Sequence, residues 1–142
     1  MADIRHSIEI DAPRERVRQL VTSASGFSQW WAADSGPKDN DAVELGFFNK
    51  STLYRLRLEA QSAAEIVWLC ESGEEWKGTR LRFKLGDSGS ATNLRFKHEG
   101  WASETDYFTS CNTTWGELMY RLKAAAEGKS QGPLFLANSL AY

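Results

Sequence analysis

The 142-residue sequence lacks long apolar runs and contains only two cysteines and three prolines. No stretch of 18 apolar residues is present, so we expect no transmembrane helix. The opening, MADIRHSIEIDAP, has no apolar segment of the kind found in a signal peptide. Two cysteines, Cys70 and Cys111, are too few for a disulfide framework, and we expect free thiols in a cytoplasmic protein.

Motifs for several chemistries are also missing. The sequence has no nucleophile elbow, no paired carboxylates and no glycine-rich phosphate loop. Without Cys-x-x-Cys or His-x-x-x-His spacing, it predicts no metal site and no cofactor. The net charge of −2 gives no bulk attraction to nucleic acid or to an anionic membrane, so neither partner is expected. An enzyme is therefore a less favoured interpretation than a binding protein.

What the sequence does contain is typical of one globular domain. It is 42% hydrophobic and 25% charged, and it carries six tryptophans. Two of them, Trp30 and Trp31, are adjacent in GFSQWW. Neighbouring side chains cannot both face the same way on a regular element. We expect one ring to anchor the core and the other to lie at the rim of a cavity.

Alternation of apolar and polar residues predicts a series of strands. It is clear in residues 4–10, 43–47, 54–58, 81–85 and 94–98. The run 66–70 is apolar on both sides, which is typical of a more buried strand. A short helix is expected to begin at Pro13, and residues 27–31 are expected to add one further helical turn. The segment 35–41 is predicted to be a loop, 49–51 a turn, and 71–78 a polar connection.

The strongest helical pattern lies near the C-terminus. Apolar residues recur at three-and-four spacing from Phe108 to Ala125. The segment 103–106 resembles a capping box at its start, and Gly128 suits its end. An amphipathic helix and a one-sided antiparallel sheet bury each other's apolar faces, which predicts an α+β fold.

Three segments resemble the START-like, or SRPBCC, superfamily. They are IDAPRERVRQLVT, GFSQWW and TTWGELMYRLKAAAEG, within a resemblance that spans residues 3 to about 128. The most similar branch is the one named after the activator of a heat-shock chaperone's ATPase. The resemblance implies the helix-grip fold of the birch-pollen allergen, in which a curved antiparallel sheet wraps a long C-terminal helix, with two short helices after the first strand. We expect residues 1–128 to form this single domain and 129–142 to form a tail.

The resemblance also implies an apolar cavity between sheet and helix. Such a cavity would bind a small apolar or amphipathic molecule, although the same aromatic residues can instead fill the core. The candidate lining residues are Trp30, Trp31, Phe47, Tyr54, Trp68, Phe83, Phe96, His6, His98, Phe108, Cys111, Trp115 and Met119. Some members of the superfamily are cyclases or hydrolases that work inside the cavity, which leaves a cavity enzyme as one alternative.

Both histidines fall on the apolar side of their strands. In a helix-grip fold the first and last strands are neighbours, so His6 and His98 are expected to be close together. They could orient a ligand or, with Cys111, bind a metal. The favoured interpretation is that a buried histidine is satisfied by a neighbouring hydrogen bond.

The outward face of the predicted sheet is basic. Its cationic residues are Arg5, Arg55, Arg57, Arg80, Arg82, Lys84, Arg95 and Lys97. One interpretation is a protein-interaction module that docks an acidic partner, as a chaperone-ATPase activator could. The favoured one is a solvated face, with cross-strand ion pairs to Glu9, Glu44 and Glu59.

The C-terminal tail, PLFLANSLAY, is apolar. Its large side chains are Leu134, Phe135, Leu136, Leu140 and Tyr142. Leaving this surface in water is costly, so we expect it to cover the cavity mouth, to pack on its own domain, or to bury against a second copy of the chain.

Overall fold

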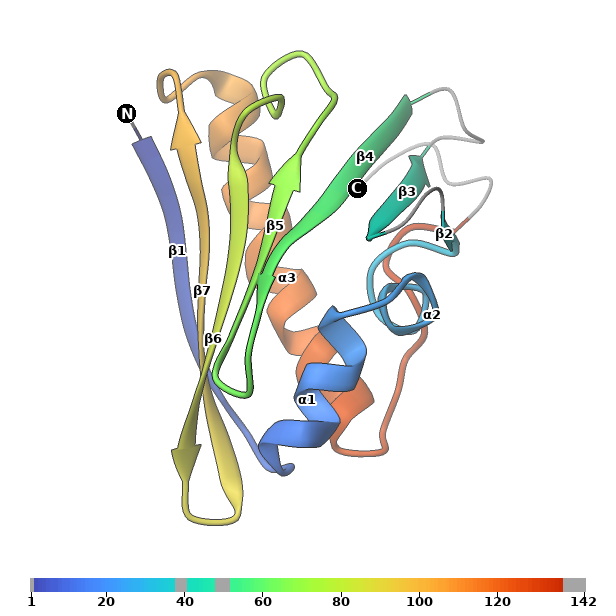
Figure 1. Cartoon of the computed structure of the whole chain (residues 1–142), viewed down its shortest axis with the longest axis vertical. Helices are drawn as coiled ribbons and strands as arrows, with labels where there is room; N and C mark the ends of the chain where they lie inside the picture. The colour runs from blue at the N-terminus through green and yellow to red at the C-terminus, as the bar shows by residue number, and fades with distance from the viewer. Residues whose placement is uncertain (1, 38–40, 48–51, 137–142) are drawn as a thin grey trace.

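The computed structural model describes residues 2–37, 41–47 and 52–136. Within these residues seven antiparallel strands form one curved sheet in the order β1-β7-β6-β5-β4-β3-β2, and a long helix lies across its inner face (Figure 1). In chain order the elements are β1 (Ala2–Ile10), α1 (Arg14–Val21), α2 (Ala24–Phe27), β2 (Asp34–Pro37), β3 (Ala42–Phe47), β4 (Thr52–Gln61), β5 (Glu65–Cys70), β6 (Arg80–Ser88), β7 (Ala91–Trp101) and α3 (Asp106–Ala126).

The strands follow the period-two pattern because one face of the sheet is dry and the other is wet. Leu81, Phe83 and Leu85 of β6 are buried, while the residues between them are more exposed. Phe83 lies opposite Phe96 of β7, so the apolar sides of neighbouring strands coincide. The structure confirms the predicted α+β helix-grip class, including the pairing of the first and last strands.

Helix α3 buries the predicted stripe against the sheet. Trp115 and Leu118 are at most 2% exposed. The helix begins at a different residue from the one expected, because the Thr105 hydroxyl accepts a hydrogen bond from the Phe108 N–H. It ends at Ala126, and the φ of 80° at Gly128 allows the Lys129 N–H to reach the Ala124 carbonyl. In the part of the chain described, no helix is both long and apolar enough to cross a membrane.

One predicted connection is more structured than expected. Residues 35–37 of the segment predicted as loop, 35–41, form β2 together with Asp34 by hydrogen bonding to β3, with Pro37 opposite Val43. An edge strand tolerates proline and needs no apolar alternation, which explains why the pattern did not reveal it. Residues 38–40 of the predicted loop and the turn at 49–51 lie outside the described residues.

The tryptophan pair lies in an irregular turn after α2, so both rings point inward. Trp30 and Trp31 are at most 1% exposed, and their ring centroids are 5.7 Å apart. The Trp30 N–H donates to the Leu20 carbonyl at 2.9 Å, and the Trp68 N–H donates to the Val21 carbonyl at 2.9 Å. These two bonds join the end of α1 to the turn and to the sheet.

Gly26 permits the close packing of α1 and α2, and we expect Gly26→Ala to destabilise the fold. A Cβ at this position would lie 2.6 Å from the Gln19 carbonyl oxygen and 2.8 Å from that of Leu20. Because backbone must shift to relieve this overlap, the free energy of unfolding should fall by about 2 kcal/mol or more in urea denaturation. The control is Gly36→Ala, whose Cβ meets nothing within 4 Å. Equal stability of the two variants would contradict the packing argument.

Candidate functional site

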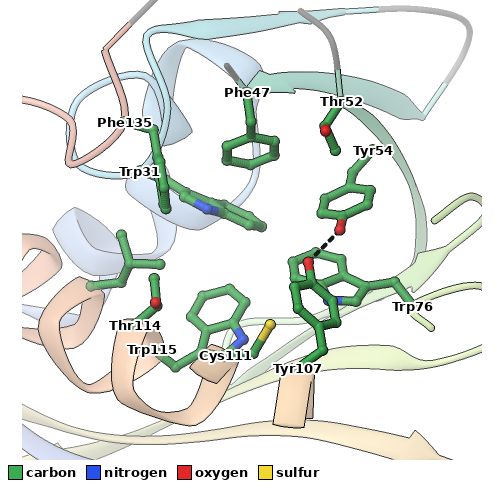
Figure 2. A pocket seen from close by; sticks show the side chains of 11 residues that line it. Trp31, Phe47, Thr52, Tyr54, Trp76, Tyr107, Cys111, Thr114, Trp115 and Phe135 are labelled. Carbon is green, nitrogen blue, oxygen red and sulfur yellow. Dashed lines mark hydrogen bonds between the residues drawn. The ribbon is translucent and has the colours of Figure 1, made fainter. Parts of the chain in front are cut away.

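A small aromatic pocket lies between α3, strands β3 and β4, and the turn that carries Trp31 (Figure 2). Its volume is about 50 Å³. The lining residues are Trp31, Phe47, Thr52, Tyr54, Trp76, Tyr107, Cys111, Thr114, Trp115, Leu118 and Phe135. Ring packing defines the walls, with centroids 5.0 Å apart for Trp31 and Trp115 and 4.2 Å apart for Tyr54 and Trp76.

The pocket is what remains after side chains have filled most of the space between sheet and helix. Phe96 packs 4.3 Å from Trp115 and 5.1 Å from Phe83 by ring centroids, and all three are buried. A volume of this size holds about three to five water molecules, whereas pockets for drug-sized ligands have roughly 300–1,000 Å³. In this conformation the pocket therefore admits only a very small molecule.

One end of the pocket is polar but uncharged. The Tyr54 and Tyr107 hydroxyls hydrogen-bond to each other (Figure 2). Burial raises the pKa of Tyr107, and the hydrogen bond to Tyr54 raises it further. Burial also raises the pKa of the Cys111 thiol, although the hydrogen-bonding groups of Trp76 and Tyr107 beside it act in the opposite direction. At neutral pH these groups are therefore protonated, and this end of the pocket offers hydrogen-bond donors rather than charge.

Trp76 is an unexpected member of the pocket. It lies in the segment 71–78, which was predicted to be a polar connection, yet its side chain is only 4% exposed. Its Nε1–H is buried without a hydrogen-bond partner in the described structure. This N–H lies close enough to the Cys111 sulfur to act against the rise in the pKa of that thiol, but a thiol sulfur accepts hydrogen bonds only weakly. A buried donor left in this state costs free energy.

His98 is the centre of a buried hydrogen-bond chain beneath the pocket. Its Nδ1 accepts from the Trp115 indole N–H at 3.1 Å. Its Nε2 lies 2.8 Å from the Thr79 hydroxyl, which itself donates to the Trp76 carbonyl at 2.6 Å. Since indole is only a donor and the Thr79 proton is already used, the imidazole must carry its proton on Nε2.

The chain also explains the protonation state of His98. The residue is fully buried, and desolvation lowers its pKa to about 3. A second ring proton would also displace the Trp115 N–H from Nδ1. His98 is thus a neutral structural residue with both nitrogens occupied.

His6 occupies a different position. It lies on β1, its ring stacks 6.5 Å from that of Phe96, and a Cβ at Gly116 of α3 would lie 3.6 Å from its Cε1. Its Nε2 is buried without a partner in the described structure. Among residues 2–37, 41–47 and 52–136, no group of three or more histidine, cysteine, aspartate or glutamate side chains could hold a metal ion.

The start of the tail closes one side of the pocket. The Phe135 N–H donates to the Trp31 carbonyl at 2.9 Å, and the Phe135 carbonyl accepts from Ala33 at 2.8 Å. Its ring meets Phe47 edge to face, with centroids 5.0 Å apart, and the residue is 5% exposed. Arg121 of α3 donates to the carbonyls of residues 131–133. The tail residues Leu140 and Tyr142 lie outside the described residues.

The outer face of the sheet carries a cationic groove of about 540 Å³. It spans β6, β7 and β1, where two adjacent rows of cross-strand neighbours face solvent. The first row is Lys84, Arg95 and Ser7, and the second is Arg82, Lys97 and Arg5. Cations directly opposite each other repel, so this arrangement does not favour strand pairing.

Several arginines of the same face are neutralised by glutamates. Arg55 and Arg57 bind Glu71 at 3.0 and 2.8 Å, and their guanidinium groups, Arg57 foremost, lower the pKa of that carboxyl. Arg80 binds Glu59 at 2.6 Å. In the groove, Arg82 binds Glu99 and Glu65, and Arg5 lies 3.4 Å from Asp3. Within the described part of the chain, Lys84, Arg95 and Lys97 have no ion pair.

Comparison with known proteins places the chain in a family. The family model described as Activator of Hsp90 ATPase homolog 1-like protein matches residues 11–127. The chain belongs to this family. Proteins of the AHSA1 fold commonly bind hydrophobic ligands. A search of curated proteins finds no match.

Solved structures agree with the AHSA1 assignment. The Aha1 dimer from Colwellia psychrerythraea is 27% identical with a TM-score of 0.79, over 91% of this chain and 98% of that one. Protein SSP2350 from Staphylococcus saprophyticus is 14% identical with a TM-score of 0.74, over 96% and 99% of the chains. DynU16, from the dynemicin biosynthetic locus, is 13% identical with a TM-score of 0.74, over 94% of this chain and 50% of that one. The last two similarities concern the fold alone.

The candidate lining residues of this AHSA1 protein divide into two groups. The pocket brings together Trp31, Phe47, Tyr54, Cys111 and Trp115. Seven of the others are buried elsewhere in the interior: Trp30, Trp68, Phe83, Phe96, His98, Phe108 and Met119. His6 is half-buried beside α3. None of these eight residues lines the pocket. They fill the sheet–helix interface, as large aromatic and aliphatic side chains do in a dense core.

The pocket also contains residues that the sequence patterns did not single out. Trp76 and Tyr107 supply its donors, and Thr52, Thr114 and Leu118 complete its wall. A tryptophan inside an otherwise polar segment was the one available signal for Trp76, since such a ring is rarely left in water. Tyr107 lies beside the apolar stripe of α3 and gave no comparable signal.

The His98 chain predicts a pH dependence of stability. An unfolded histidine binds a proton near pH 6.5, whereas folded His98 does so near pH 3, so the unfolded state binds more protons as pH falls. Stability should be highest above pH 6.5 and should fall by about 2 kcal/mol between pH 7 and 5. Urea denaturation measures this loss, and His98→Gln should remove most of it. Titration of His98 near pH 6.5 by NMR in the folded protein would contradict the assignment.

Proposed function

We propose that this protein binds a small, largely apolar molecule in the aromatic pocket beside α3. The observation that carries the proposal is the pocket itself, an unfilled space walled by Trp31, Phe47, Tyr54 and Trp115 in an otherwise densely packed interior. Burial of apolar ligand surface would supply the binding free energy, at roughly 25 cal/mol per Å². The common behaviour of the fold family supports the same interpretation.

Phe135 sets the size of the ligand. Its ring already occupies one side of the pocket, and its backbone is held by Trp31 and Ala33. With the ring in place, about 50 Å³ is free, which is less than the roughly 150 Å³ of an engineered cavity that binds benzene. We therefore infer that a ligand with a six-membered ring takes the place of the Phe135 side chain.

Replacing Phe135 should create a binding site for a simple aromatic probe. Phe135→Ala removes a buried ring and should lower the free energy of unfolding by about 3 kcal/mol. Toluene should bind this variant about tenfold more tightly than it binds the wild type, because the competing ring is gone, and should restore part of the lost stability. Calorimetric titration and thermal unfolding of the full chain measure both effects.

A filled-pocket variant provides the control. Thr114 faces the pocket from α3, so Phe135→Ala combined with Thr114→Leu should fill the space and abolish toluene binding. Leu134→Ala is a second control for Phe135→Ala. It also removes an apolar side chain from the tail, but that side chain is half-buried and does not line the pocket. The proposal fails if toluene does not bind Phe135→Ala, or if the Thr114 substitution leaves binding unchanged.

We propose as a second candidate that the outer groove docks an acidic partner. Its support is the double row of cations, because Lys84, Arg95 and Lys97 are without ion pairs in the described structure although the chain as a whole is acidic. Like-charge neighbours cost pairing energy, and an acidic segment lying along the rows would offset that cost. A chaperone or another protein with an acidic surface fits this chemistry.

Charge reversal tests the groove. A glutamate-rich peptide should bind at low salt, and Lys84→Glu with Lys97→Glu should weaken binding at least about tenfold, because two attractions become repulsions. The control pair is Lys77→Glu with Lys129→Glu, which changes net charge equally at exposed positions outside the groove. Fluorescence anisotropy at two salt concentrations measures the affinities. Equal weakening by both pairs would exclude a specific site.

A further inference from the structure

The polar end of the aromatic pocket carries a buried N–H that lacks a strong acceptor, beside a pair of hydrogen-bonded hydroxyl groups. Trp76 Nε1–H has no hydrogen-bond partner in the described structure. The Tyr107 hydroxyl is paired with that of Tyr54, and both Tyr107 and Trp76 also border the Cys111 sulfur. Figure 2 shows Trp76, Tyr107 and Cys111 on the side of the pocket away from Phe47 and Phe135. Donors that converge on a weak acceptor are suited to receive a better one.

We propose that Trp76 and Tyr107 receive a neutral oxygen of the ligand, so that the pocket selects small aromatic molecules carrying a carbonyl or ether group. This inference rests on the proposed ligand site and adds the chemical class of its occupant. The aromatic part of the ligand takes the apolar end, where Phe135 now lies. Its oxygen then lies beside Cys111, between the two donors.

The indole N–H of Trp76 differs from those of Trp30, Trp68 and Trp115, which all have hydrogen-bond partners. The N–H groups of Trp30 and Trp68 donate to backbone carbonyls, and that of Trp115 donates to His98. Trp101 also has a buried N–H without a partner in the described structure, but it does not line the pocket. Trp76 thus combines an unsatisfied donor with a position at the ligand space, and Trp101 serves as its matched control.

The surroundings favour a neutral oxygen over a carboxylate. The donors come from uncharged side chains, and no lysine or arginine is among the residues that line the pocket. The negative charge of Glu75 is close enough to contribute to the raised pKa of the Cys111 thiol. An anion placed at the same point would meet the same repulsion and would be desolvated without a counter-charge.

An isosteric pair of ligands isolates the oxygen. Acetophenone and α-methylstyrene have the same shape and differ in a C=O against a C=CH₂ group. Acetophenone should bind Phe135→Ala about tenfold more tightly, as expected for donors that gain an acceptor, and benzoate should bind more weakly than either. Addition of acetophenone should also move the Trp76 indole N–H proton resonance downfield, whereas α-methylstyrene should not. Calorimetry and ¹⁵N-edited NMR measure these effects.

Two tryptophan variants complete the test in the Phe135→Ala background. Trp76→Phe keeps an aromatic ring but removes the N–H, so the preference for acetophenone should fall to about twofold or less, while α-methylstyrene binding reports any change of pocket shape. Trp101→Phe should leave the preference unchanged.

The outcomes separate the two proposals. If both isosteres bind equally and the Trp76 resonance does not move, the oxygen site is wrong although the ligand pocket stands. If benzoate binds more tightly than acetophenone, the proposal that the ligand oxygen is neutral is wrong. If neither isostere binds, the ligand pocket itself is wrong.

Discussion

The contact between Trp115 and His98 holds the rest of the structure in place. It is a single hydrogen bond between the middle of α3 and the inner face of β7, and it continues through Thr79 to the backbone of Trp76. The helix, the sheet and the connection between β5 and β6 therefore share one buried polar chain. In a dry interior such a chain fixes the relative positions of these three elements, because a shift of any one of them leaves a donor or acceptor without a partner. The floor of the aromatic pocket is built on these three elements.

The second constraint is the volume of the aromatic side chains. A curved sheet around one helix encloses more space than aliphatic residues fill easily, and this chain fills most of it with rings. Trp30, Trp68 and Phe83 take the end of the interior near α1, whereas the Phe135 ring enters from the tail at the other end. The pocket lies between the aromatic core of the sheet and helix and the Phe135 ring of the tail. Its capacity is thus set by a residue outside the sheet–helix unit.

Sequence patterns were sufficient for the elements whose apolar residues face the core. The period-two strands and the α3 stripe follow directly from burial, and the same reasoning placed His6 and His98 on neighbouring strands. The structure of edge and connecting segments is determined by other interactions, which leave no periodic pattern in the sequence. Strand β2 is held by hydrogen bonds from β3 rather than by its side chains, and Trp76 is buried by contacts distant in sequence. Trp76, the unpartnered donor of the pocket, comes from such a connecting segment, and Tyr107 lies beside the apolar stripe of α3. For these reasons the two donors were not foreseen, while five of the wall residues were.

The double row of cations on β6, β7 and β1 shows how little the outer face contributes to strand alignment. Lys84 stands directly opposite Arg95, so the pairing of these strands is determined by the inner face and the backbone ladder. A surface with little part in specifying the architecture can change its composition more freely than the core. Members of one fold family can therefore acquire different exterior recognition properties while keeping the same interior, and the two faces of this sheet can evolve independently.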